Sequence, residues 1–558
     1  MKKFTYTVAA AALMLTASCS KDFLEKVPQG QLSSTQTLSQ DAVNSLLVGA
    51  YGLMNGNING TWGNYASAPS QWLFGEVAAD NAHKGSTSTD QPFMNQVESH
   101  QPTADNDNLQ IMWRNYFEGI LRCNNTLRTL AALQSSGNNA FSQDAATQIQ
   151  AETRMLRAHY YFFLHRIFIN VPLIDENTTT AQAAVLSNTT DVLPSIKADL
   201  DFAVANLPAT STAGRMNKVI AQAYLGKYLL YQKQYAPALA QFTAVISARG
   251  LLTGMPFQNN FDVTTKNGPE SIMASQSVIN PDGSGDNANV GDMLSGLYGT
   301  SPVGCCGFYQ PTIDLVNAYK VDANGLPLLD GSYRTNPYRG SGSTATIAFD
   351  PRLDYTVGRQ GVSYLDYGIM PGNDWVRDAA YAGPFVGIKT MVPKSQFAAN
   401  TVSGAAYITA LNVNIIRLAD VVLMAAECNA ELGNLPEATR LVNLVRARAA
   451  TLPAKVNAAG QPAAIYRVGQ YPTFASQDYA RNAIRFERRL ELAMEGHRFF
   501  DLVRWGVAKQ VIESYSGFEG GILSAYRGIQ FETRDTYFPI PQDQIDKSQG
   551  NLKQNPSY

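Results

Sequence analysis

Apolar residues recur at helical spacing through much of the chain, with polar residues at the positions between them. Long stretches of this kind predict helices over residues 38–55, 109–133, 146–168 and 192–206, and again over 414–449 and 476–514. Ser39 stands in front of the first stretch and is a predicted N-cap. The pattern therefore predicts a mostly α-helical protein.

Two pairs of predicted helices share the spacing of tetratricopeptide repeats. Gly226 is followed twelve residues later by Ala238 and four residues beyond that by Phe242, and Ala426 and Ala438 repeat the first interval. Small residues at these positions let two helices approach closely, while the aromatic residue packs against the next unit. We therefore expect two helix pairs that flank a central insertion.

The helical spacing is lost between about residues 251 and 415. Gly, Pro, Asn, Asp and Ser interrupt this region every few residues, apart from a short helical stretch at 312–319. Residues 272–276 and 355–358 are predicted short strands. Aromatic residues are too frequent for a disordered segment. An irregular, aromatic-rich region held on helices is a predicted binding surface, because function concentrates in loops on rigid supports.

The first 35 residues are expected to lie outside the fold. Lys2 and Lys3 precede an apolar run over residues 8–15 that is too short to span a bilayer, and small residues then lead to Cys19. Residues 1–18 are similar to a bacterial lipoprotein signal, which makes Cys19 the predicted lipidated residue and 19–35 a tether. The remaining regions are an N-terminal helical region (36–250), the insertion (251–415) and a C-terminal helical region (416–558).

Charge and cysteine content narrow the possible partners. The net charge is −2 and there is no basic tract, so nucleic acid is not an expected partner. Cys123 and Cys428 lie in helical patterns and are expected to be buried small residues. A disulfide between the adjacent Cys305 and Cys306 is possible in an oxidising compartment, but the strained ring makes it the less expected state. Without a CxxC motif or metal-binding histidine spacing, we expect neither a metal site nor another cofactor.

Residues 484–505 carry the densest charge pattern in the chain, on a helical pattern that Gly496 is predicted to break. Glu487, Glu491 and Glu495 recur every four residues among arginines, which indicates either a solvent-exposed helix face, the default expectation, or a buried ion network. Neighbouring arginines lower the pKa of a carboxyl group, whereas a general acid requires a raised pKa. A catalytic role for these carboxylates is therefore not expected.

Several motifs together resemble the SusD/RagB family of surface lipoproteins. They are Asp22-Phe23-Leu24-Glu25 after the signal, residues 157–168 with Val171-Pro172-Leu173, residues 417–427 and 443–449, the charged stretch 487–502, and Phe538-Pro539-Ile540-Pro541. The correspondence runs from the signal to the last residues and is interrupted mainly by the insertion.

This resemblance implies a SusD-like fold in which tetratricopeptide-like helix pairs support an irregular, loop-rich insertion with a few short strands. It also implies a non-enzymatic lipoprotein, anchored by lipid on the outer face of the outer membrane. Such a protein binds an oligosaccharide or polysaccharide and delivers it to a SusC-like TonB-dependent transporter. Binding of a peptide or another nutrient is the alternative, and a secreted glycoside hydrolase is a distant one. Our hypothesis for residues 484–505 is then a scaffold element, whose acidic side chains pair with arginines such as Arg446, Arg448 or Arg498 and fix the packing of the helices.

Glycan binding requires flat aromatic faces for sugar C–H groups and polar side chains for hydroxyls. The aromatic candidates lie in loops: Trp62, Tyr65, Tyr298, Phe308, Tyr309 and Trp375. Asp80, Asn81 and Lys84 are the candidates for hydroxyl contacts. The alternative is that these aromatic residues anchor their own loops. Trp72 and Trp113 lie within helical patterns and are expected in the core.

Overall fold

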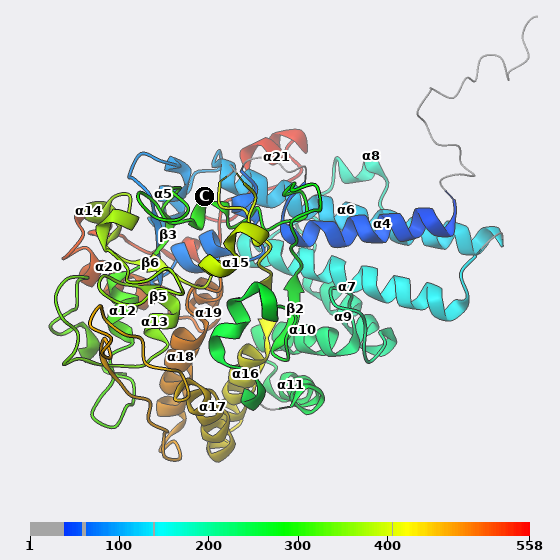
Figure 1. Cartoon of the computed structure of the whole chain (residues 1–558). Coiled ribbons are helices and arrows are strands. Elements are labelled where there is room, and N and C mark those ends of the chain that lie inside the picture. The colour runs from blue at the N-terminus through cyan, green and yellow to red at the C-terminus, as the bar shows by residue number, and fades with distance from the viewer. Residues whose placement is uncertain (1–37, 59–62, 138–139, 251, 404–405) are drawn as a thin grey trace, which may run out of the picture.

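The computed structural model describes residues 38–58, 63–137, 140–250, 252–403 and 406–558, of which 50% are helical and 7% are in strands (Figure 1). The N-terminal helical region consists of α4 (Gln40–Gly52), α5 (Pro92–Glu98), α6 (Asp107–Ser136), α7 (Gln143–Phe168), α8 (Thr180–Ala183), α9 (Leu193–Asn206), α10 (Lys218–Tyr231) and α11 (Tyr235–Arg249). The side chain of Ser39 caps α4, as predicted, by accepting a hydrogen bond from the backbone N–H of Ala42.

The two predicted repeat pairs form and lie against each other. They are α10 with α11, and α16 (Leu418–Glu431) with α17 (Leu435–Ala449), and α11 packs on α16. A Cβ atom at Gly226 would lie only 2.5 Å from the ring of Phe242, so the small residue is what allows α10 and α11 to approach. The insertion therefore leaves and rejoins one continuous helical scaffold.

The C-terminal region continues with α18 (Gln477–Leu492), α19 (Arg498–Arg504), α20 (Ala508–Glu519) and α21 (Gln542–Lys547). The predicted break at Gly496 is present, although α18 already ends four residues earlier. Gly496 has φ +80°, and a Cβ atom there would lie 1.8 Å from the carbonyl oxygen of Ser70. Glycine is therefore required where this turn meets the N-terminal region.

The insertion contains short helices and contributes at least one strand to each of the four two-stranded sheets found among the described residues. The helices are α12 (Ile313–Ala318), α13 (Leu353–Thr356), α14 (Ala379–Ala382) and α15 (Lys394–Asn400). The antiparallel pairs are β1 (Ala82–Gly85) with β3 (Phe308–Pro311), β2 (Ser271–Ser275) with β7 (Val413–Arg417), and β5 (Val357–Gly358) with β6 (Val386–Gly387). The parallel pair is β4 (Ala348–Phe349) with β8 (Ile465–Tyr466).

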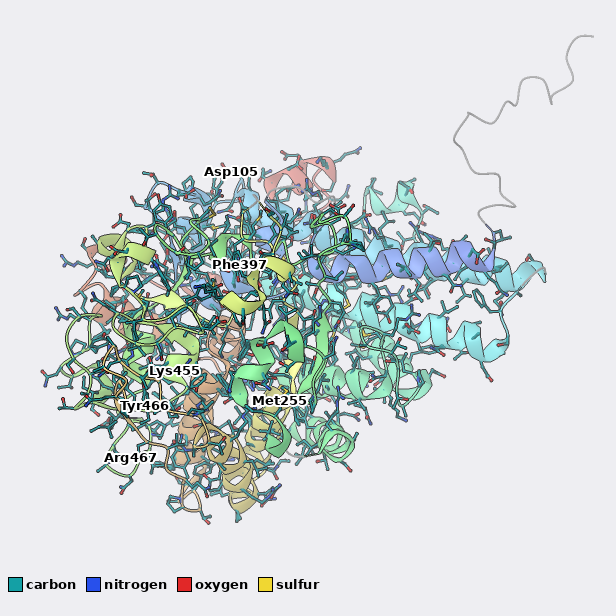
Figure 2. All side chains as sticks on the ribbon, in the orientation of Figure 1. Asp105, Met255, Phe397, Lys455, Tyr466 and Arg467 are labelled. Atoms are coloured by element: carbon teal, nitrogen blue, oxygen red, sulfur yellow. A yellow bond between two sulfur atoms is a disulfide. The ribbon has the colours of Figure 1, made fainter. Side chains whose placement is uncertain are left out.

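The strand predictions are confirmed in part. The stretch 272–276 forms most of β2, but α13 takes up 355–356 and leaves only 357–358 as strand. A helix was expected from residue 414, whereas the structure has β7 at 413–417. These residues form a strand because they pair with β2, which brings the beginning and the end of the insertion together. After α17 the chain lies beside the insertion again, where β8 pairs with β4. Lys455, Tyr466 and Arg467 belong to this part of the chain (Figure 2).

The carboxylates of residues 484–505 do not form a solvent-exposed face. Glu487 and Glu491 are both 0% exposed, so the default expectation for this stretch is wrong. Segments of the insertion cover this side of α18, and no local charge pattern could have indicated their position. The alternative, a buried ion network, is what the structure contains.

The network joins α18 to three other parts of the fold. Glu487 binds Arg446 of α17 and Arg352 of the insertion, each at 2.7 Å. Glu491 binds Arg352 at 3.0 Å, Arg417 of β7 at 2.7 Å, and Arg448 of α17. The predicted pairing with Arg446 and Arg448 is thus confirmed.

Further charges complete the network beyond α18. Glu270, directly before β2, also pairs with Arg417 and Arg448. Glu495 pairs with Arg417 at 2.7 Å and with Lys389 of the insertion at 2.6 Å. Burial by itself would raise the pKa of Glu491, but the charges of Arg448 and Arg417 outweigh it and hold the pKa well below its usual range.

Glu491→Gln should destabilise the fold, because it leaves buried guanidinium groups without a compensating charge. We expect a loss of about 3–5 kcal/mol in the free energy of unfolding, measured in urea. Glu437→Gln is the matched control, since Glu437 pairs with Arg440 at the surface and should cost at most about 1 kcal/mol. Equal losses in the two variants would contradict a structural role for the network.

Candidate functional site

Loops that contain Asp90, Tyr298 and Arg377 converge around β1 and β3. The pairing of His83 with Gln310 brings residues 82–85 against 308–311. The backbone N–H of Tyr298 donates to the carbonyl oxygen of Trp375 at 3.2 Å. Arg377 reaches across to the loop after β1 and donates to Asp90 at 2.7 Å and to Ser86 at 2.8 Å. Most of the predicted site residues thus belong to one loop cluster.

Asp80 and Asn81 lie beneath this cluster and do not face solvent. Each is 1% exposed. Asp80 pairs with Arg498 at 2.7 Å and Arg489 at 3.1 Å, so Arg498 serves Asp80 rather than the carboxylates of α18. Asn81 donates to Glu76 and accepts from Arg489. Their polar groups hold the fold together, and the predicted hydroxyl contacts do not fit these positions.

The electrostatics of Asp80 follow from its arginine partners. Burial alone would raise the pKa of Asp80, but the charges of Arg489 and Arg498 hold it well below its usual range. Arg489 also binds Asp314 of α12 at 2.8 Å. The segment before β1 is therefore tied to α12, α18 and α19 by ionised groups.

Lys84 and Phe308 are also interior residues. The ammonium group of Lys84 donates to the carbonyl oxygens of Thr87 and Asp90 at 2.8 and 2.6 Å and lies 5.2 Å from the ring centre of Tyr381. Burial lowers the pKa of Lys84 to about 8. Phe308 is 3% exposed on β3. The lysine closes the loop after β1 and is not available to a ligand hydroxyl.

The remaining buried aromatic candidates support the loops from below. Tyr309 lies 5.5 Å from the ring of Trp72, and the ring of Trp375 packs edge-on to Tyr364 at 5.4 Å. Tyr65 is largely buried and its hydroxyl donates to Gln91. The contacts of these side chains match the alternative stated in the sequence analysis, in which the aromatic residues anchor their own loops. Trp72 and Trp113 are core residues, as predicted.

Tyr298 differs from the other candidates because it is only half-buried. The guanidinium of Arg377 lies 5.2 Å from its ring centre, and Arg377 and Asp90 form an ion pair whose side chains are 32% and 30% exposed. We call Tyr298, Arg377 and Asp90 the exposed triad. The nearby Cys305 and Cys306 are joined by a disulfide. Trp62 and Cys19 lie outside the described residues.

Arg377 and Asp90 were not among the candidates from the sequence. Asp90 ends a polar run, and Arg377 follows Trp375 by two residues in a turn. A charged residue close to a candidate aromatic residue in the sequence is only weak evidence for a binding site. The evidence becomes stronger once the structure shows that the loop of Arg377 contacts the loop of Asp90. In the described part of the chain, no cluster of His, Cys, Asp and Glu side chains could hold a metal ion.

His83 fixes β1 from the opposite side. It is 0% exposed, and its two ring nitrogens lie 3.2 Å from a carboxylate oxygen of Glu98 and 2.9 Å from one of Glu519. Its ring stacks on Tyr526 at 3.8 Å. Burial by itself would lower the pKa of His83, but the hydrogen bonds and charges of the two carboxylates raise it to about 9.

Comparison with known families accounts for nearly the whole chain. Residues 269–558 match the SusD family, and residues 22–230 match a family described as starch-binding and associating with the outer membrane. A SusD-like protein of Bacteroides ovatus is 25% identical over 524 residues, covering 90% of this chain and 83% of the relative. SusD-like protein P25 of Formosa agariphila is 24% identical, with 90% of each chain covered.

Solved structures show the same fold. A laminarin-binding SusD-like protein matches with a TM-score of 0.66 at 24% identity, covering 93% of this chain and 100% of the other. Surface glycan-binding protein A from Bacteroides thetaiotaomicron, in complex with laminarihexaose, matches with a TM-score of 0.66 at 19% identity, covering 93% and 99%. This chain belongs to the SusD family and has the predicted SusD-like fold; it is a binding protein rather than an enzyme.

The charge on His83 should make stability pH-dependent. Its folded pKa of about 9 exceeds the ordinary value of 6.5, so its contribution is complete below about pH 6.5 and is lost as the pH rises through about 9. That gap corresponds to about 3 kcal/mol. The stability difference between wild type and His83→Gln should therefore shrink over this range, measured by urea unfolding at each pH.

His100→Gln is the control for this experiment. Burial lowers the pKa of His100 to about 3, so His100 is neutral in the folded protein throughout the range and its substitution should have a constant effect above about pH 7.5. A stability difference for His83→Gln that does not change between pH 6.5 and 9 would show that His83 is uncharged in the folded protein.

Proposed function

We propose that this protein is a cell-surface lipoprotein that binds an oligosaccharide or polysaccharide and delivers it to a SusC-like TonB-dependent transporter. Membership of the SusD family supports glycan binding, as does the match to a laminarin-binding SusD-like protein and to a surface glycan-binding protein in complex with laminarihexaose. The observation that carries the proposal is the convergence of loops on the exposed triad.

The exposed triad combines the groups that sugar recognition requires. Tyr298 is half-buried, and the part of its side chain that reaches solvent offers a surface for sugar C–H groups. The guanidinium of Arg377 donates, and the carboxylate of Asp90 accepts, so hydroxyl groups of a ligand find both kinds of partner. The two charged groups already orient each other at 2.7 Å, which reduces the entropy lost when a ligand binds.

The buried candidates act as supports in this proposal. Trp375 holds the loop of Arg377 through its packing with Tyr364, and its carbonyl oxygen fixes the backbone of Tyr298. Lys84 and Phe308 hold the loop that carries Asp90. Trp62 keeps its place as a proposed ligand contact on sequence grounds, since it belongs to the loop that leads to Tyr65.

We further propose anchoring through a lipid on Cys19 with the protein facing the cell exterior. The signal-like pattern before Cys19 supports this, as does the family description that names the outer membrane. None of the helices described by the structure is both long enough and apolar enough to cross a membrane. The transporter partnership rests on family membership.

A glycan panel with variants of the exposed triad tests the binding proposal. Tyr298→Ala and Arg377→Ala should each weaken binding of the best ligand about fivefold, because each removes a contact of about 1 kcal/mol. Tyr479→Ala is the control, since Tyr479 is 40% exposed on α18 and should leave affinity unchanged. Affinities are measured by isothermal titration calorimetry, and the products are assayed for reducing sugar.

The outcomes separate the alternatives. Saturable binding without release of reducing sugar, weakened only by the two triad variants, supports the proposal. A lack of binding to every glycan contradicts it and favours a peptide or another nutrient. Binding that all three variants retain places the glycan site elsewhere on the protein.

The anchor is tested by Cys19→Ala in cells. Loss of the acylated thiol should move the protein from the outer-membrane fraction to the soluble fraction, measured by fractionation and immunoblotting. Ser20→Ala is the control and should stay in the membrane fraction. A Cys19→Ala protein that remains with the membrane would contradict lipid anchoring at this residue.

A further inference from the structure

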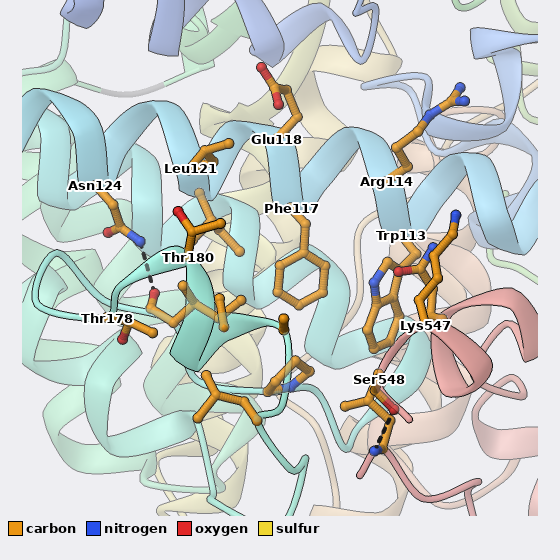
Figure 3. Close-up of a pocket in the computed structure, with 18 of the residues that line it drawn as sticks. Trp113, Arg114, Phe117, Glu118, Leu121, Asn124, Thr178, Thr180, Lys547 and Ser548 are labelled. Atoms are coloured by element: carbon orange, nitrogen blue, oxygen red, sulfur yellow. Dashed lines mark hydrogen bonds between the residues drawn. The ribbon is translucent and has the colours of Figure 1, made fainter. Parts of the chain in front are cut away.

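A pocket of about 530 Å³ opens beside the middle of α6 and shares no residue with the exposed triad. Its walls are α6, the chain from 172 to 186 that includes α8, and the C-terminal segment around α21 (Figure 3). Trp113 and Phe117 point from α6 into this space. Its volume lies within the range of small-molecule sites in proteins, about 300–1,000 Å³.

The walls of this pocket are mainly apolar. Besides the two aromatic rings, Leu121, Ile174 and Leu186 line it, and Leu121 is 44% exposed. An apolar pocket that stays open to solvent is costly unless something covers it, because apolar area left in water forgoes about 25 cal/mol per Å². The pocket therefore favours a ligand with a substantial apolar part.

Two polar side chains on the walls, those of Asn124 and Ser548, are already engaged within the protein. Asn124 donates to the carbonyl oxygen of Ile174 at 3.0 Å and accepts from Arg157 at 2.9 Å. The hydroxyl of Ser548 donates to the carbonyl oxygen of Ile545 at 2.7 Å. A sugar would bring many hydroxyl groups and would leave most of them unpaired against these walls. A second glycan site is therefore a poor fit to the pocket.

The charged side chains at the opening of the pocket indicate which charge the polar part of a ligand carries. Two of the rim charges are neutralised: Glu118 pairs with Arg122 at 2.8 Å, and Lys547 pairs with Asp543 at 2.6 Å. Arg128 is half-buried, and its guanidinium donates to the carbonyl oxygens of Thr178 and Glu176 at 3.1 and 3.5 Å and to the side-chain oxygen of Asn125 at 2.6 Å, all of them uncharged acceptors. Among the residues that the structure describes, no carboxylate forms an ion pair with Arg128.

We propose that this pocket binds an amphipathic carboxylate. The alkyl chain or ring system of the ligand occupies the space between Phe117 and Leu186, and its carboxylate pairs with Arg128 at the rim. The apolar walls supply affinity through burial of the chain, while the guanidinium selects the anionic head group. This inference does not depend on the proposed glycan function.

Decanoate is a suitable probe, titrated into the purified chain by isothermal titration calorimetry below its micelle-forming range. Leu121→Ala should weaken binding about fivefold, because it removes part of the apolar wall. Leu432→Ala is the matched control: Leu432 is 48% exposed at the end of α16 and outside the pocket, so its truncation should leave affinity unchanged. Ala183→Phe, which fills the pocket, should abolish binding.

The head group is tested by comparing decanoate with the neutral decanol. Arg128→Gln should weaken decanoate about threefold and leave decanol unchanged, since only the acid carries a charge. Melting temperatures equal to that of the wild type exclude unfolding as the cause. Absence of saturable decanoate binding, or equal binding by wild type and Ala183→Phe, would overturn the proposal. Equal effects of Arg128→Gln on both ligands would overturn the assignment of a carboxylate.

Discussion

The rest of the structure depends on the burial of the carboxylates of α18 among guanidinium groups from distant segments. Removing such charges from water costs several kcal/mol per ion, and the cost is offset only when every partner is in place. Glu491 alone requires Arg352 from the insertion, Arg417 from β7 and Arg448 from α17. The helical scaffold and the irregular insertion are therefore coupled, because neither can move away without leaving a buried charge unpaired.

The same kind of interaction continues under the proposed binding loops. Asp80 is held by Arg489 and Arg498, and a charged His83 is held between Glu98 and Glu519. These contacts attach β1 to α5, α18, α19 and α20. The loops above β1 and β3 are thus presented on a rigid base, and a site on a rigid base loses less entropy when a ligand binds.

The candidate site could be predicted only in part. Loop composition directed attention to the segments around Lys84, Tyr298 and Trp375, and the structure brings these segments into one cluster. It could not show that Asp80, Asn81, Lys84, Phe308 and Tyr309 are covered, because the covering residues come from other segments of the chain. Arg377 was missed for the same reason. Its significance lies in its contact with Asp90, which is 287 residues earlier in the chain.

The sequence by itself determined the features that depend on near neighbours: the main helices, the Ser39 cap, the small residues of the repeat pairs, the break at Gly496 and the family motifs. Helical spacing and capping act within a few residues, so they can be recognised without the fold. Only the tertiary structure decided which charges pair, which aromatic residues stay exposed and where a pocket opens beside α6. Burial and ion pairing are set by segments far apart in sequence, whose contacts exist only once the whole chain has packed.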